Sequence, residues 1–110
     1  MNKNSNFNNI LSESIIFERG TTPSTKVKPN SSTDVVVTFS KVFPQIPTIH
    51  VYVIKSISDY MNGDNQALTS VEVKDVTHTS CLLTISFLNT GSSYSTNAEV
   101  LWNAEATVTS

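Results

Sequence analysis

The chain has 110 residues, a length that accommodates one domain with a single hydrophobic core. A formal net charge of −2 and the lack of any Lys/Arg cluster exclude strong long-range attraction to nucleic acid or to an anionic membrane. Only 15% of the residues are charged, and 16 Ser and 14 Thr supply much of the polarity, which favours short strands with polar outer faces over surface helices.

The first residues, Met1 to Asn9, contain no apolar segment of signal-peptide length, and no stretch of the sequence approaches a membrane span. We therefore expect the chain to be made in a cytoplasm and not exported by the usual secretory route. The lone cysteine, Cys81, cannot form an internal disulfide. Without secretion, the formal glycosylation sequence that begins at Asn30 indicates a turn.

The N-terminal part of the chain is weakly patterned. Residues 1–13 are rich in Asn and lack periodicity, whereas residues 14–18 form a short apolar run that predicts a first strand or a docking arm. Residues 21–33 contain two prolines and mostly small polar residues, which indicates a connection. We therefore divide the chain into an extended N-terminal arm or docking segment, residues 1–30, and a folded domain, residues 31–110.

Alternation of apolar and polar residues begins after this connection and predicts short strands separated by turns. The turns are marked by Pro44 and Pro47, by the loop at residues 55–68 and by residues 89–93. Nothing in the pattern predicts a long amphipathic helix. The predicted strands lie at residues 34–39, 48–54, 71–74, 81–87 and 98–106.

These elements predict an all-β fold, a small antiparallel β-sandwich of about six strands when the run at residues 14–18 is included. The inward side of the alternation defines the expected core. Its members are Val35, Val37, Phe39, Ile49, Val51, Val53, Val71, Val73, Cys81, Leu83, Ile85, Phe87, Val100 and Trp102.

Five large apolar residues point away from this core if the phase of the alternation is correct. Such groups are unfavourable in water, and they indicate an oligomer interface if they are contiguous. Two alternatives stay open: some of them cover the N-terminal arm, or the phase slips by one residue, which turns a whole strand over. The five residues are Val36, Tyr52, Ile54, Leu82 and Leu101.

Three segments, in this order, resemble the H-type lectin family. Residues 37–49 resemble a strand that ends in Thr-Phe, a turn with an aromatic residue and a proline, and a second strand. Residues 73–81 are similar to the family's strand–turn–strand, with Ser80-Cys81 where Gly-Phe is usual. Residues 100–104 resemble the last strand, in which a tryptophan is followed two residues later by a small residue.

What the resemblance implies is a six-stranded antiparallel sandwich that assembles as a homotrimer, with sugars bound at the rim between protomers in many members. Related domains occur in bacteriophage tail, baseplate and fibre proteins. Because the sequence shows no signal peptide, the chain is more similar in this respect to the bacteriophage proteins than to secreted agglutinins. The resemblance spans residues 14–106, but Leu68 or Thr69 replaces the family's sugar-binding arginine, and Phe87-Leu88 replaces its adjacent tryptophan and histidine.

The sequence contains no recognisable catalytic motif, so we predict neither enzyme activity nor a cofactor. No zinc-site spacing is formed by the soft ligands, which are His50, His78 and Cys81. One loop gathers oxygen ligands of the kind that calcium accepts, but the same residue types are typical of turns, and we predict no metal. The loop residues are Asp59, Asn62, Asp64 and Asn65.

Tyr94 lies in a loop with hydroxyl and amide residues, a composition typical of a glycan-contacting rim. His50 lies on a strand beside Tyr52, where it would line an oligomer axis or contact a ligand. Each has a plainer alternative: Tyr94 packs on its own loop, and His50 is a polar residue of an outer face. The predicted ligand-binding residues are Tyr94, Ser92, Asn97 and His50.

These observations predict a binding or assembly module. The first hypothesis is a homotrimeric virion protein of a bacteriophage, in the tail, baseplate or a fibre. It would dock on other virion proteins through residues 1–30 and contact host-surface glycans through its lectin-like domain. No nucleic-acid or membrane partner is expected. The alternatives are a free soluble carbohydrate-binding lectin and a capsid or tail decoration protein without a ligand.

Overall fold

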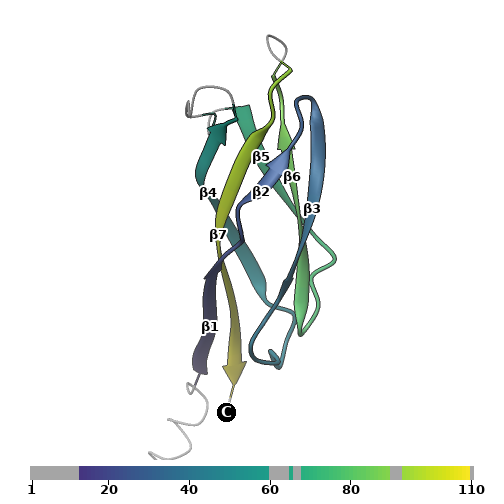
Figure 1. Ribbon diagram of the computed structural model, residues 1–110. Coiled ribbons are helices and arrows are strands. Elements are labelled where there is room, and N and C mark those ends of the chain that lie inside the picture. Colours follow the sequence, from purple (N-terminus) through teal and green to yellow (C-terminus); the bar gives the residue numbers. More distant parts are fainter. Residues whose placement is uncertain (1–12, 60–64, 66–67, 90–92, 110) are drawn as a thin grey trace, which may run out of the picture.

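The computed structural model describes residues 13–59, 65, 68–89 and 93–109, and these residues form an antiparallel β-sandwich (Figure 1). In this part of the chain no helix is long and apolar enough to cross a membrane. The predicted all-β sandwich is confirmed. Its strands are β1 (Glu13–Thr21), β2 (Thr25–Val27), β3 (Ser31–Thr38), β4 (Thr48–Ser58), β5 (Thr69–Lys74), β6 (Ser80–Phe87) and β7 (Thr96–Thr109).

The first sheet is organised around β7, which has 14 residues. β1 pairs with the C-terminal part of β7 and β2 with its first residues, both on one edge, while β4 pairs with the other edge. The second sheet has the order β3-β6-β5, and every pairing in both sheets is antiparallel. β7 and β6 are therefore the central strands of the two layers (Figure 1).

The core lies between the two sheets and is formed largely by alternate residues of these central strands. The predicted core residues Val37, Phe39, Val100 and Trp102 are buried, as are all four that were predicted on β6. Half-buried residues pack against them at the edges, because the outer strands cover each other less completely. These are Val35, Ile49, Val51, Val71 and Val73 from the predicted set, with Ile16 and Val76 in addition.

Two fully buried apolar residues, Val27 and Phe43, lie outside the predicted strands. The backbone N–H of Phe43 donates to the carbonyl of His78 at 2.9 Å, which holds the β3–β4 connection against the end of β6. The Phe43 ring meets that of Phe39 edge to face at 5.2 Å between centroids, and Phe39 lies 5.7 Å from Trp102. This aromatic cluster closes one end of the core.

The prediction that residues 21–33 form only a connection was wrong, because they contain β2 and the start of β3. Thr22 explains the break between β1 and β2. Its N–H donates to the carbonyl of Val100 at 2.9 Å, and its Oγ1 accepts from the N–H of Val100 at 3.0 Å. The side chain thereby continues the pairing beside Pro23, which has no N–H to donate.

The described part of the predicted N-terminal arm therefore belongs to the sandwich, since β1 and β2 are both strands of the first sheet. A turn at Pro29 and Asn30 then leads into β3 on the second sheet. Asn30 has a φ of 56°, a left-handed conformation that Asn tolerates. Its amide exchanges hydrogen bonds with the backbone of Asn89, donating to O at 2.9 Å and accepting from N at 3.0 Å.

Gly20 faces the indole of Trp102, its direct partner across the β1–β7 pairing. A Cβ atom at position 20 would lie 2.7 Å from Cε2 and 2.9 Å from Nε1 of Trp102, well inside ordinary van der Waals separation. Trp102 cannot retreat freely, because it packs on Phe39 in the aromatic cluster. Glycine is therefore required here for space.

We expect Gly20→Ala to lower the free energy of unfolding by about 1–3 kcal/mol, because the added methyl group overpacks the indole site. Urea denaturation followed by the fluorescence of Trp102, the chain's single tryptophan, measures the change. Thr21→Ala, at the exposed neighbouring position, is the control and should shift stability by less than about 0.5 kcal/mol. Equal stabilities of the two variants would show that Trp102 yields without cost.

Candidate functional site

The predicted ligand-binding residues lie at two separate places. Tyr94, with 44% of its surface exposed, directly precedes β7, and Asn97 lies near the start of β7. His50 lies on the outer face of the first sheet and pairs in register with Asn103. Six residues of extended strand separate Asn97 from Asn103, which is about 20 Å. Ser92 lies outside the described residues, so the structure brings together only Tyr94 and Asn97.

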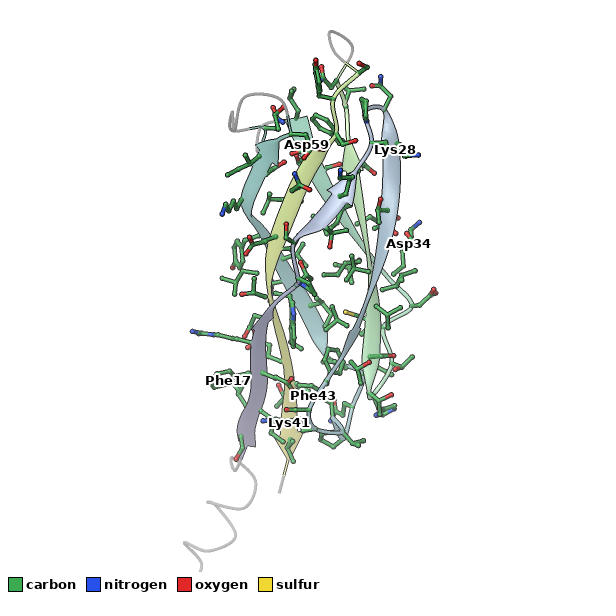
Figure 2. The ribbon with its side chains drawn as sticks, in the orientation of Figure 1. Phe17, Lys28, Asp34, Lys41, Phe43 and Asp59 are labelled. Carbon is green, nitrogen blue, oxygen red and sulfur yellow. The ribbon has the colours of Figure 1, made fainter. Side chains whose placement is uncertain are left out.

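Asn97 is occupied by contacts within the fold. Its Nδ2 donates to Oδ1 of Asp59 at 2.5 Å, and Oδ2 of Asp59 lies 3.1 Å from Nζ of Lys26. The hydrogen bond from Asn97, followed by the contact with Lys26, holds the pKa of Asp59 below its ordinary value. This group joins β2, β4 and β7 at the end of the sandwich where Asp59 is labelled in Figure 2.

The oxygen-rich loop shows no cation site in its described residues. Asp59 is held by Asn97 and Lys26, and Asn65 contacts β7 through Nδ2, which lies 3.4 Å from Oγ1 of Thr96. Asn62 and Asp64 lie outside the described residues. Elsewhere in the described ranges no three His, Cys, Asp or Glu side chains are placed to hold a metal.

A hydroxyl network lies beneath this loop. Ser56 Oγ lies 2.7 Å from Oγ1 of Thr69 and 2.8 Å from Oγ1 of Thr96, and Thr69 also donates to the carbonyl of Asn65 at 2.8 Å. Ser56 and Thr96 are fully buried, so each hydroxyl depends on the others for hydrogen bonds. The network fixes the positions at which β4, β5 and β7 enter the loop end.

A shallow groove of about 270 Å³ lies on the outer side of the second sheet near the same end. Leu68 and Phe87-Leu88, which occupy the sugar-ligand positions of the lectin resemblance, line it together. Serine hydroxyls form its polar part, and Oγ of Ser32 and Oγ of Ser86 are 2.7 Å apart. The serines come from three strands, so spacing along the chain gave no signal of them. The full lining is Asn30, Ser31, Ser32, Leu68, Ser70, Ser86, Phe87 and Leu88.

The outer face of the β1-β7-β4 sheet, which we call the apolar face, exposes four large apolar side chains. Ile15 is 65% exposed, Tyr52 58%, and Phe17 and Ile46 52% each. Across the strands this face has rows that follow the register, with Phe17, Glu105 and Thr48 in one row and Arg19, Asn103 and His50 in the next. Phe17 lies toward the end of the sandwich opposite Asp59 (Figure 2).

The predicted interface residues divide between this face and the opposite side of the molecule. Tyr52 and Leu101 are paired on the apolar face, whereas Val36 and Leu82 are paired on the outer face of the second sheet. The structure does not describe the side chain of Ile54. The five residues therefore do not form one contiguous patch, because they belong to two different sheets. Ile15, Phe17 and Ile46 were missed because they lie in the predicted arm and in a turn.

A trough of about 330 Å³ crosses the apolar face where β4 begins. The pairing of β4 starts at Thr48 and Glu105, so β7 continues past it with only β1 as a neighbour. Ile15 and Ile46 contribute apolar side chains to its lining, which is otherwise largely polar and includes Thr107 and Glu105. His50 Nε2 lies 3.5 Å from Oε1 of Glu105 at the edge of this trough.

His78 and Cys81 have structural positions. Nδ1 of His78 lies 2.7 Å from the carbonyl oxygen of Phe43, in the connection that closes the core. Cys81 is 2% exposed, and its burial raises the pKa of the thiol, which disfavours the reactive thiolate.

Comparison with known proteins shows a likeness of fold. The chain is similar to a C-terminal fragment of the P. aeruginosa R1 pyocin fibre, with a TM-score of 0.60 and 17% identity over 84% of this chain and 23% of the fragment. It is similar to an N-truncated R1-type pyocin tail fibre with a TM-score of 0.61 and 15% identity, over 96% of this chain and 98% of that one. No family model matches the sequence, and no curated protein does.

We expect Asn97→Ala to raise the pKa of Asp59 toward its ordinary value, because the largest stabilising contact of the carboxylate is removed. Carbon-detected NMR titration of the Asp59 carboxyl group measures the pKa. The lowered pKa also stabilises the fold at neutral pH, and this contribution disappears as the pH falls below about 4. Lys26→Ala is the comparison and should also raise the pKa, because it removes the cation beside the carboxylate. An unchanged pKa in both variants would contradict the assigned causes.

Proposed function

We propose that the chain is a domain of a bacteriophage-type tail fibre, a homotrimeric virion protein that serves attachment or assembly. The observation that carries the proposal is the fold likeness to the N-truncated R1-type pyocin tail fibre, which extends over nearly the whole of both chains. A shared fold is not a shared function, so the proposal also depends on the surfaces of this chain.

The apolar face supports assembly. Monomeric proteins rarely leave large apolar side chains exposed beside one another, as Ile15 and Phe17 are on β1, and aromatic residues such as Phe17 and Tyr52 are enriched in protein interfaces. In the proposed virion the partners are further copies of the chain and other virion proteins. Docking through residues 1–30 is part of the proposal, and β1 within that segment presents Ile15 and Phe17.

The loop end supports contact with a host-surface glycan. Tyr94 offers an aromatic surface, and the serine groove offers hydroxyl donors and acceptors with Leu68 and Leu88 beside them. The buried hydroxyl network and the Asp59 group link β2, β4, β5 and β7 at this end. The alternative of a decoration protein without a ligand is favoured by one observation, the internal engagement of Asn97.

The assembly part of the proposal is tested by sedimentation equilibrium of the purified full chain. We expect a species of three times the 12.0 kDa chain mass at micromolar concentration. A monomer across the whole concentration range would contradict the homotrimer.

The attachment part is tested by glycan-array binding of the same preparation. Tyr94→Ala should weaken binding by roughly tenfold if the ring packs against a sugar. Val36→Ala, on the outer face of the second sheet, is the matched control and should bind like the wild type. Absence of binding to any glycan would leave the assembly role and remove the lectin-like one.

A further inference from the structure

Two exposed features of the apolar face fit each other across two copies of the chain. The first is a projecting pair: the guanidinium carbon of Arg19 lies 5.4 Å from the centroid of the Phe17 ring, so the cation covers the ring and the two side chains form one unit. The second is the trough, whose largely polar lining includes the carboxylate of Glu105 and the apolar side chains of Ile15 and Ile46.

We infer that Phe17 of one copy inserts into the trough of the next copy around a three-fold axis parallel to the strands. The inference rests on the proposed homotrimer and adds the surface that forms it. The axis follows the strands because they run along the long direction of the sandwich, so that lengthwise packing buries the most surface (Figure 1).

The register of the sheet places the two features at the same height. Phe17, Glu105 and Thr48 share one row across β1, β7 and β4, and both Glu105 and Thr48 line the trough. Rotation about an axis parallel to the strands keeps every residue at its own height. The β1 side of one copy therefore meets the β4 side of the next with Phe17 level with the trough.

Charge complementarity supports the same arrangement. Arg19 lies one row from Glu105 on the apolar face, so insertion of Phe17 brings the guanidinium beside the carboxylate of the neighbouring copy. The trough, at about 330 Å³, has room for an aromatic side chain. His50 Nε2, 3.5 Å from Oε1 of Glu105, lines the same trough.

The other outer face does not offer an equivalent contact. Its exposed large apolar residues among the described ones are Leu68 and Leu88 at the serine groove and Val36, whose neighbours on that face are polar or charged, apart from Leu82. Thr84 there donates to Oδ1 of Asp34 at 2.8 Å, and Lys74 lies 3.7 Å from Glu72. This surface is compatible with exposure to water in the assembly.

The contribution of Phe17 to trimer affinity is tested by sedimentation equilibrium of Phe17→Ala and its matched control Val36→Ala. Phe17→Ala should raise the dissociation constant of the trimer roughly thirtyfold or more, as truncation of an interface aromatic residue does, while Val36→Ala leaves it unchanged. Because both side chains are more than half exposed, circular dichroism and thermal unfolding should show that each variant still folds.

The pairing of copies is tested by charge reversal. Arg19→Glu and Glu105→Arg should each weaken the trimer, and the double variant should regain most of the affinity, because the ion pair is restored with its sign exchanged. Lys74→Glu, on the opposite face, is the control for the change in net charge. A trimer that resists all changes on the apolar face would overturn the inference and leave the proposed function intact, whereas a monomeric wild type would overturn both.

Discussion

The pairing of three strands with β7 is the constraint on which the rest of the molecule depends. β7 is long enough to receive β1 and β2 in succession on one edge while β4 occupies the other. The succession works because Thr22 supplies a side-chain acceptor to Val100 at the junction, so that no buried N–H is left unsatisfied there. Lengthening or shortening the junction by one residue would turn the faces of β2 over and remove Val27 from the core.

The two faces of β7 account for the two properties of the first sheet. On the inner face, Ala98, Ala104 and Ala106 are small, which lets the sheets approach and leaves the large volume at Trp102 to be matched by Gly20 on β1. On the outer face, β7 extends beyond the start of β4 and thereby creates the trough beside Glu105. The length mismatch between neighbouring strands, together with the β3–β4 connection that carries Ile46, therefore generates the trough on this face.

Alternation along the chain predicted the strands and most of the core because side-chain direction in a strand is a local property. It could not find β2, whose three residues are too few to show a period, or Phe43, which lies in a Pro-flanked connection. It also could not decide whether Val36 and Tyr52 share a surface. Alternation tells which residues of one strand lie on the same face, but the assignment of strands to sheets depends on pairing between segments far apart in the sequence.

The same reasoning explains why the candidate ligand residues separated. His50 and Asn97 lie on strands that pair with each other, yet antiparallel register sets them about 20 Å apart, a distance that composition cannot reveal.

Around Asn97 the polar groups satisfy one another, as Asp59 accepts from both Asn97 and Lys26. Beside Phe17 the same face also exposes Ile15 and Ile46 among polar residues, and the guanidinium of Arg19 already lies on the Phe17 ring. A surface whose polar groups are saturated gains little from a protein partner, whereas exposed apolar area gains free energy in proportion to the water it loses. Assembly is therefore expected at the apolar face, and the loop end is left for contacts outside the assembly.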